Sequence, residues 1–321
     1  MPTTSVDPIE MGVSRTQKKA SVDVRPVPAF VRARIVVVRA CLAGCIRLFG
    51  LNGLYSMGRF FGTLEYLTDY NRRRRVHTKL KQFFKDQATP SWRRRVTRQY
   101  FMRIRCDKMF YTIMDRIPRD QLLGRIEFIG REHVNAALAR NKGLFAAMCH
   151  FGSQHVAGLM MALMGYRLAG VRDPKESHVR RYIQRKYRET FPEIAAMKMF
   201  YSDAFPRELF RYYRDNEIVA SLLDVDRARG QTLKTYPVSI FGETRDFLTG
   251  PLKIAIRCKA TVLQGFVISR PNFHYQIIST PPLFDPEAVE DEEQTVATAI
   301  QTYADRVEQH AREHPDHLMK I

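Results

Sequence analysis

The 321-residue chain is poor in cysteine and lacks the common motifs for metal and nucleotide binding. Its five cysteines are odd in number and scattered, at positions 41, 45, 106, 149 and 258. This pattern excludes a disulfide scaffold, so we expect folding in a reducing compartment. The sequence has no CxxC pair, no Gly-rich phosphate loop and no GxGxxG. We therefore predict no metal and no cofactor, and a nucleotide-dependent enzyme is disfavoured.

Long apolar runs are also missing, because no uninterrupted stretch reaches the roughly 20 residues that span a bilayer. Between positions 30 and 67 the Val, Leu, Ile and Phe residues are interrupted by five arginines: Arg32, Arg34, Arg39, Arg47 and Arg59. This pattern disfavours a spanning helix and predicts an amphipathic helix in the headgroup plane, with the arginines reaching lipid phosphates. Residues 1–29 lack the apolar segment of a signal peptide and predict a disordered basic leader.

Negative charge is scarce in the first third of the chain. Residues 1–110 hold 23 Lys and Arg against 7 Asp and Glu, so 16 of the formal net charge of +19 lies there. A field of one sign predicts an anionic partner: nucleic acid, an anionic membrane surface or an acidic carrier protein. A solvated basic face without any partner is the alternative. We find no nucleic-acid-binding motif, so no specific nucleic acid is expected and that hypothesis rests on charge alone.

From about position 124, short apolar runs alternate with amphipathic segments. Strands are predicted at 124–130, 143–149, 166–171, 217–223, 235–241, 261–268 and 274–279. Helices are predicted at 132–141, 155–165, 176–191, 206–216 and 249–259. This alternation predicts an α/β fold with a central, largely parallel sheet flanked by helices and functional groups at the carboxyl ends of strands.

The same patterns predict how the chain is divided. Residues 1–29 form the leader, and residues 30–123 form an N-terminal helical, membrane-associating region. Residues 124–321 form the α/β core, which ends in an amphipathic helix that caps the sheet.

His150 is the first candidate for chemistry, because it directly follows the apolar strand at 143–149 and precedes Gly152 and a predicted helix. An imidazole titrates near neutral pH and can take a proton from a hydroxyl or amine nucleophile. A hydrogen-bonded structural histidine is the alternative. Cys149, within the strand, is expected to be a small buried hydrophobe rather than a nucleophile.

Four landmarks occur in a fixed order along the chain. They are His150-Phe151-Gly152 after a strand, Arg188 at a helix end about forty residues on, Asp224-Val225-Asp226 after another strand, and Phe241-Gly242 followed by Thr249-Gly250-Pro251. In combination they resemble the bacterial late acyltransferases of lipid A biosynthesis, the lauroyl/myristoyl transferase family. They also resemble the actinobacterial relatives that acylate phosphatidylinositol mannosides. Both groups belong to the glycerolipid acyltransferase superfamily, and the resemblance extends from about Arg32 to the C-terminus.

This resemblance implies transfer of a fatty acyl chain from an acyl carrier protein or CoA thioester to a hydroxyl or amine of a glycolipid or other lipid acceptor. The implied location is the cytoplasmic face of the bacterial inner membrane, with peripheral or monotopic attachment. The family uses direct transfer, which disfavours Ser153 as an acyl-enzyme nucleophile. Arg188 is then expected to grip a phosphate or headgroup of the acceptor.

One position departs from the family pattern. The family has Asp or Glu at the fifth position after the histidine, whereas this chain has His155. A neutral imidazole accepts only one hydrogen bond and cannot replace the anion. Another carboxylate must therefore orient His150, and Asp224 is the best candidate because it also ends a central strand. A relative that binds lipid but has lost turnover is the alternative.

Acyl transfer from a thioester needs a base, a partner that orients the base, and donors facing the oxyanion. We assign the first two roles to His150 and Asp224. The backbone N–H groups of Gly152 and Ser153, at a helix N-terminus, are the predicted oxyanion donors. Asp226, Thr249 and Gly250 either contact substrate or shape the surrounding loops. An apolar trench beside His150 is expected to hold the acyl chain.

Overall fold

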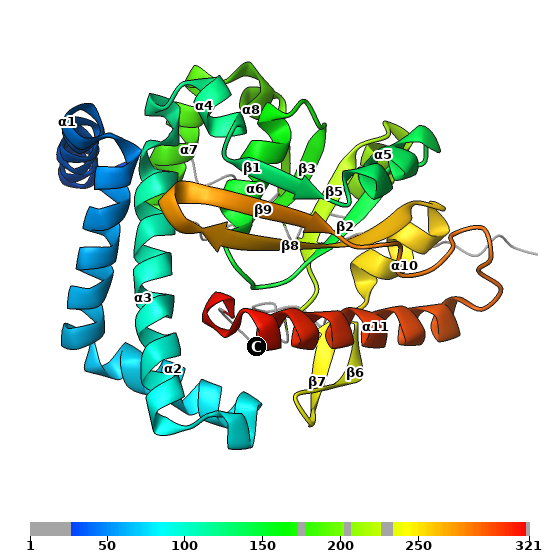
Figure 1. Cartoon of the computed structure of the whole chain (residues 1–321). Helices are drawn as coiled ribbons and strands as arrows, with labels where there is room; N and C mark the ends of the chain where they lie inside the picture. Colours follow the sequence, from blue (N-terminus) through cyan, green and yellow to red (C-terminus); the bar gives the residue numbers. More distant parts are fainter. Residues whose placement is uncertain (1–26, 173–176, 202–206, 226–233, 319–321) are drawn as a thin grey trace, which may run out of the picture.

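The computed structural model describes residues 27–172, 177–201, 207–225 and 234–318 of the chain. In these residues a seven-stranded sheet has the order β1-β9-β8-β2-β5-β3-β4. The strands are β1 (Ile126–Ile129), β2 (Leu144–Met148), β3 (Leu168–Arg172), β4 (Lys198–Tyr201), β5 (Ile218–Leu222), β8 (Thr261–Arg270) and β9 (His274–Ser279). Helices cover both faces of the sheet and bury one apolar cluster on each (Figure 1).

The sheet is mostly parallel, because β8, β2, β5, β3 and β4 run in one direction. Only the β9 and β1 end runs the other way, since β9 pairs antiparallel with β8 and β1 pairs parallel with β9. The prediction of an α/β fold with a largely parallel central sheet is confirmed. Both faces of the central strands are covered, which explains why the sequence shows continuous apolar runs there.

The helices arrange as two layers around the sheet, with further helices at the N-terminal end (Figure 1). The longer ones are α1 (Ala29–Thr68), α2 (Tyr70–Phe84), α3 (Pro90–Ile113), α5 (Arg131–Ala139), α6 (Gln154–Leu163), α7 (His178–Thr190), α9 (Arg207–Arg214), α10 (Gly250–Arg257) and α11 (Glu292–Glu313). The shorter ones are α4 (Arg119–Leu123), α8 (Pro192–Ala196) and the 3-10 turns η1 (Lys85–Gln87), η2 (Met114–Arg116), η3 (Pro271–Phe273) and η4 (Pro315–His317).

The C-terminal helix α11 lies along one face of the sheet (Figure 1). Its residues Ile300, Tyr303 and Val307 are buried in the same cluster as side chains of β2, β5 and β8. Their spacing places them on one side of the helix. The predicted capping of the sheet by this helix is therefore observed.

The Phe241-Gly242 landmark forms the tip of a separate hairpin of β6 (Thr235–Ile240) and β7 (Glu243–Leu248). Both tip residues have positive φ, at 54° and 72°, as the tightest hairpin turns require. The Phe241 ring is buried and stacks on Phe83 of α2 at 4.8 Å between ring centroids. This landmark therefore joins the hairpin to the N-terminal helices.

Helix α1 is bent at Gly50, where φ is 65° and ψ is −170°. Glycine adopts this conformation without steric penalty, so the helix divides into two legs. The second leg lies along α3, as Figure 1 shows, and buries Leu54 completely. The division of the whole chain at positions 29 and 123 stays a prediction.

The observed α1 corrects one expectation drawn from the arginine-interrupted pattern. The helix contains an 18-residue window of mean hydropathy 1.7, which by length and composition alone is enough to cross a membrane, so the expectation that α1 lies in the headgroup plane stays a prediction. Arg39 does not reach outward, because it is buried, donates to the Thr112 carbonyl at 2.5 Å and pairs with Asp115. The other four arginines of this stretch are exposed.

Candidate active site

The register of β2 and β5 brings His150 and Asp224 together. Leu144 lies opposite Ile218 along these parallel strands, and Met148 lies opposite Leu222. Both pairs are 74 positions apart in the sequence, and so are His150 and Asp224, two residues beyond the strand ends. The two side chains therefore meet because each strand continues for the same distance past the sheet edge.

Asp224 holds His150 by two hydrogen bonds. Its Oδ1 atom lies 2.9 Å from His150 Nδ1, and its Oδ2 atom accepts the His150 backbone N–H at 2.7 Å. The carboxylate is fully buried, whereas the imidazole keeps 17% of its surface exposed. Because an ionised carboxylate only accepts, Nδ1 carries the proton and the lone pair lies on Nε2. This arrangement is suited to accepting a proton from a hydroxyl group.

Tyr303 of α11 braces the strand that carries His150. Its hydroxyl donates to the Met148 carbonyl at 2.8 Å, and the same carbonyl accepts the Leu223 backbone N–H at 3.1 Å. Burial, followed by the negative charge of Asp224, raises the pKa of Tyr303 well above its usual value. The phenol therefore stays a donor. The sequence pattern of the C-terminal helix does not mark this hydroxyl, so sequence analysis did not single out Tyr303.

In the turn after His150, one of the two predicted oxyanion donors forms a hydrogen bond within the protein. Gly152 has a φ of +62°, and a Cβ atom there would lie 1.8 Å from the Val267 carbonyl oxygen. Its N–H donates to the His317 carbonyl at 2.9 Å, so the Gly152 amide already has an acceptor within the protein. The Ser153 N–H has no acceptor among the described residues and precedes the N-terminus of α6. Ser153 is thus the better placed of the two, and the oxyanion role of both amides stays a prediction.

Comparison with known protein families identifies the family to which this site belongs. The family model described as bacterial lipid A biosynthesis acyltransferase matches residues 30–321. The chain belongs to this family. The prediction of an acyltransferase is thereby confirmed, and the family implies a lipid acceptor and an acyl thioester donor. A search of curated proteins finds no match.

In this acyltransferase His155 takes no part in the pair formed by His150 and Asp224. The His155 Nδ1 atom lies 2.9 Å from Arg180 Nη2, so it accepts from the guanidinium. Desolvation, the positive charge of Arg180 and the neighbouring His150 lower the pKa of His155. Because the side chain is exposed to solvent, desolvation has a small effect and the direct contact with the Arg180 guanidinium is the main cause. His155 is therefore a neutral acceptor directed toward α7.

Arg188 lies in the last turn of α7, away from the Arg180 contact with His155. Arg188 Nη2 donates to the Ala195 carbonyl of α8 at 2.9 Å. It lies eight residues beyond Arg180 in α7, which corresponds to about 12 Å along the helix axis. The arginine next to the first turn of α6 is thus Arg180, which sequence analysis did not single out. The position of Arg180 in the first turn of its helix was the available signal.

The other predicted site residues fall near the Asp224 strand or outside the described part. The Thr249 N–H and hydroxyl both donate to the Lys234 carbonyl, at 3.0 and 3.2 Å, and Gly250 begins α10. These contacts are architectural, and a substrate contact by Thr249 or Gly250 stays a prediction. Asp226 lies outside the described residues. Cys149 is buried, and burial together with Asp224 raises the pKa of its thiol well above the usual value.

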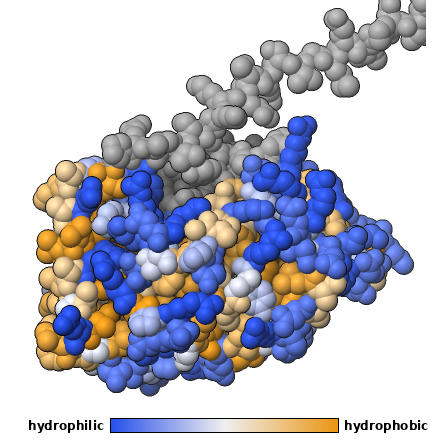
Figure 2. All heavy atoms as spheres, turned by 90° about the horizontal axis from the view of Figure 1, so that it is seen from above, coloured by the Kyte–Doolittle hydropathy of each residue, from blue (hydrophilic) through white to orange (hydrophobic). Residues whose placement is uncertain are grey.

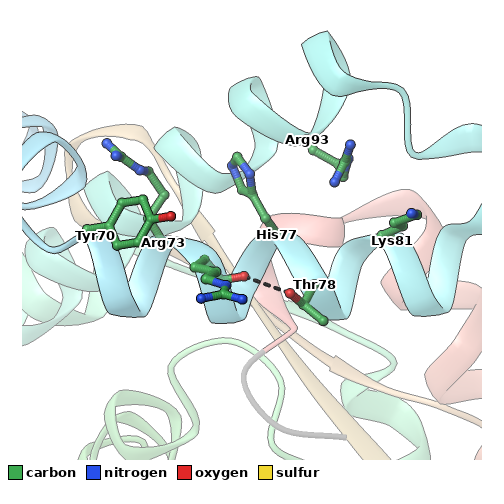
Figure 3. Close-up of a pocket in the computed structure, with 7 residues that line it drawn as sticks. Tyr70, Arg73, His77, Thr78, Lys81 and Arg93 are labelled. Atoms are coloured by element: carbon green, nitrogen blue, oxygen red, sulfur yellow. Dashed lines mark hydrogen bonds between the residues drawn. The ribbon is translucent and has the colours of Figure 1, made fainter.

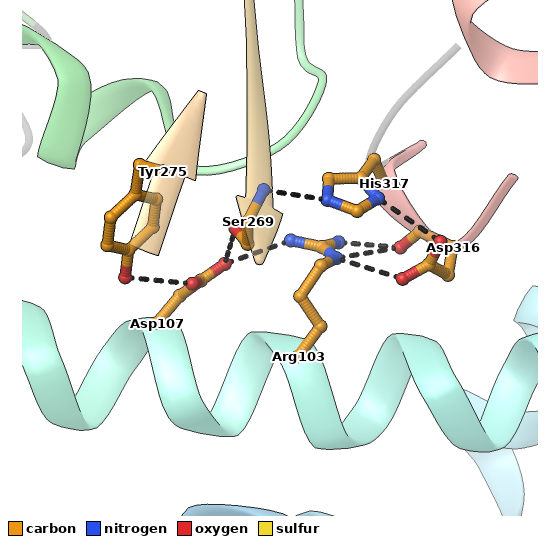
Figure 4. A network of polar contacts seen from close by, with 6 residues as sticks. All are labelled: Arg103, Asp107, Ser269, Tyr275, Asp316 and His317. Carbon is orange, nitrogen blue, oxygen red and sulfur yellow. Dashed lines mark hydrogen bonds and ion pairs between the residues drawn. The ribbon is translucent and has the colours of Figure 1, made fainter. Parts of the chain in front are cut away.

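His317, whose carbonyl accepts the Gly152 N–H, belongs to a polar network (Figure 4). His317 Nε2 accepts the Ser269 backbone N–H at 2.9 Å, and its Nδ1 donates to Asp316 Oδ1 at 3.1 Å. Burial and the Arg103 guanidinium lower the pKa of His317, in agreement with an imidazole that accepts at Nε2. Since the His317 carbonyl holds the Gly152 N–H, the C-terminal turn η4 positions the loop that carries His150.

Arg103 and Asp107 of α3 anchor this network to the sheet (Figure 4). Arg103 donates to the Asp316 carbonyl at 2.7 and 3.0 Å and to Asp107 Oδ2 at 3.0 Å. Asp107 also accepts from the hydroxyls of Ser269 and Tyr275, at 2.9 and 3.1 Å. The acid is buried, but with three donors around it the buried charge has partners.

The acyl-chain trench expected beside His150 stays a prediction. Two surface hollows of the described residues do not contain His150: one is lined by α2 and Arg93, and the other lies where Phe83 and Phe84 meet the Phe241 hairpin tip. The segments that follow β3, β4 and β5 in the chain, from residues 173, 202 and 226, lie outside the described residues.

Proposed function

We propose that this acyltransferase moves a fatty acyl chain from an acyl carrier protein or CoA thioester to a hydroxyl or amine of a lipid acceptor. His150 is the general base and Asp224 orients it. The observation that carries this proposal is the bond from His150 Nδ1 to a buried carboxylate, which leaves Nε2 to take a proton. Asp224 supplies the carboxylate that the His155 position lacks, so no observation favours a relative without turnover.

In the first step, Nε2 of His150 takes the proton of the acceptor hydroxyl while that oxygen attacks the thioester carbonyl carbon. A C–O bond forms, and the carbonyl electron pair moves onto the carbonyl oxygen. The negative charge of Asp224 stabilises the imidazolium that results, as in other histidine-carboxylate pairs. The Ser153 N–H, at the positive end of α6, donates to the developing oxyanion.

In the second step, the tetrahedral intermediate reforms the C=O bond and breaks the C–S bond. The leaving thiolate takes the proton from the imidazolium, so His150 returns to its neutral form and the reaction is balanced. This sequence needs no cofactor other than the thioester substrate. It also needs no acyl-enzyme, so the Ser153 hydroxyl has no covalent role.

The surface of α1 supports action at a membrane. Exposed large apolar side chains gather on this helix: Phe30, Val36, Val37, Val38, Leu48, Phe49, Phe60, Phe61, Leu64 and Leu67. Figure 2 shows apolar surface at the edge where α1 lies. Exposed apolar side chains gathered on one helix in this way mark a binding surface. We propose that it contacts an anionic membrane at the cytoplasmic face of the bacterial inner membrane.

The test incubates purified protein with radiolabelled acyl carrier protein and CoA thioesters and a bacterial lipid extract. We expect labelled lipid with the wild type and a loss of about 10²- to 10⁴-fold in His150→Ala, the usual contribution of general base catalysis. His155→Gln is the matched control and is expected to keep most activity. Undiminished labelled lipid with His150→Ala eliminates the assigned base, and no labelled lipid with the wild type supports a silent relative.

The nucleic-acid alternative is tested separately, by binding to anionic vesicles and to duplex DNA at matched salt. We expect vesicle association. Tight DNA binding without vesicle association contradicts the proposed membrane location.

A further inference from the structure

A basic hollow lies against α2, far along the chain from His150 (Figure 3). It has a volume of about 420 Å³ and is lined by Tyr70, Arg73, Arg74, His77, Thr78, Lys81 and Arg93. Six of these residues come from α2, and Arg93 comes from the first turn of α3. We call this feature the α2 hollow. Its volume suits a small ligand or a lipid headgroup.

The α2 hollow has positive charge without a counterion from the protein. Arg73, Arg74, Lys81 and Arg93 line it, and in the described part of the chain none of the four pairs with a carboxylate. Arg73 instead donates to the Tyr66 carbonyl at 2.9 Å and lies over the Tyr66 and Tyr70 rings. Four cations around one concavity repel one another unless an anion enters.

Two buried polar atoms at the hollow also have no hydrogen-bond partner among the residues that the structure describes. These are His77 Nε2 and Arg93 Nε, which the surrounding chain shields from solvent without supplying a hydrogen bond. Figure 3 shows His77 reaching from α2 toward the side where Arg93 lies. Burial, followed by the charges of Arg93 and Arg73, lowers the pKa of His77. A buried polar atom without a partner is unfavourable, so a ligand rich in acceptors would stabilise this arrangement.

We propose that the α2 hollow binds the phosphate group of an anionic phospholipid headgroup. Guanidinium groups form paired, charge-assisted hydrogen bonds with phosphate oxygens, and Lys81 adds a point charge. This inference rests on the proposed function, because that function places the enzyme on a lipid surface. It adds a defined headgroup site, whose lining includes neither His150 nor Asp224, to a general attraction between charges.

The position of the hollow favours a lipid over a soluble phosphate. The exposed apolar side chains of the second leg of α1 end at Phe61, Leu64 and Leu67. Tyr70, which is 60% exposed, follows directly and lines the hollow. With this apolar face in the acyl-chain region, the hollow lies at the end of α1 where a phosphate layer is expected.

The test measures binding of the full chain to phosphatidylcholine vesicles with and without phosphatidylglycerol, at fixed ionic strength. Arg74→Gln/Lys81→Gln removes two exposed charges that make no ion pair in the described structure. Lys142→Gln/Arg214→Gln is the matched control, because both of its residues are exposed and outside the hollow. We expect about 25-fold weaker binding to phosphatidylglycerol vesicles for the first variant, about fivefold per cation. The control is expected to stay within about twofold of the wild type.

Competition identifies the source of the phosphate. Excess inorganic phosphate or CoA, at the same ionic strength, is expected to leave vesicle binding nearly unchanged. Equal losses in the two double variants overturn the proposal, because bulk charge then explains binding. Displacement of the protein from vesicles by CoA also overturns the proposal. So does an Arg74→Gln/Lys81→Gln variant that no longer binds acyl carrier protein but still binds vesicles like the wild type. His150→Ala is expected to bind vesicles like the wild type, so failure of catalysis and failure of this site are distinguishable.

Discussion

Replacing Asp224 with Asn tests the orienting role with the smallest change of shape. The carboxylate accepts from both the backbone N–H and Nδ1 of His150, at 2.7 and 2.9 Å. An asparagine has one acceptor atom and one donor atom, so it satisfies only one of these bonds. If its NH₂ group faces Nδ1, the ring must carry its proton on Nε2, and the base loses its lone pair.

The magnitude follows from the charge that is lost. A carboxylate about 3 Å from an imidazolium contributes about 4 to 6 kcal/mol at an effective dielectric constant of about 20, before the cost of burying the carboxylate is subtracted. About 4 kcal/mol remains after a modest desolvation penalty, which corresponds to about 10³-fold in rate. We expect kcat to fall by about this factor and KM to change by less than about threefold.

The assay is single-turnover transfer of a labelled acyl chain, with thermal unfolding as a check on folding. Asp246→Asn, an exposed aspartate of β7, is the matched control and is expected to keep wild-type rates. A folded Asp224→Asn protein with the wild-type kcat refutes the reasoning. A large rise in KM with an unchanged kcat refutes it too, because the carboxylate would then act in binding.

Three further predictions concern the loop after His150. Ser153→Ala is expected to keep kcat within about threefold in the transfer assay and to trap no acyl-protein, whereas complete loss of turnover indicates a covalent role. Gly152→Ala is expected to destabilise the fold by at least about 2 kcal/mol in denaturant unfolding, because its Cβ would meet the Val267 carbonyl; an unchanged midpoint contradicts the described turn. Burial and Arg103 lower the pKa of His317 below its unfolded value, so this residue binds a proton more readily in the unfolded state. Unfolding free energy is therefore expected to fall as pH decreases below about 6.5, less steeply in His317→Gln, and equal slopes argue against this assignment.

Much of the sheet could be predicted from the sequence, but the contacts between distant segments could not. Apolar runs predicted the central strands, because both faces of β2 and β5 are buried. The sequence missed β7, where Glu243, Arg245 and Asp246 interrupt the pattern, and the short strand β4. These strands bury too little apolar surface to leave a continuous run.

The candidate site shows the same limit. The histidine-carboxylate pair was predictable, because His150 and Asp224 each follow a buried strand. The partners of the arginines were not, since Arg39 pairs with Asp115 and Arg180 meets His155 only through helix packing. Charge alone therefore predicted an anionic surface, whereas the fold decides which arginines remain available for it.

The central claim is that a buried carboxylate steers the imidazole of His150, and its tautomer is the most direct measurement. ¹⁵N NMR of histidine-labelled protein at neutral pH, assigned with His150→Gln, distinguishes a protonated from an unprotonated ring nitrogen. We predict that His150 carries its proton on Nδ1 with Nε2 free, and that Asp224→Asn disturbs this state. A wild-type ring protonated on Nε2 alone, or a spectrum that Asp224→Asn leaves unchanged, contradicts the account.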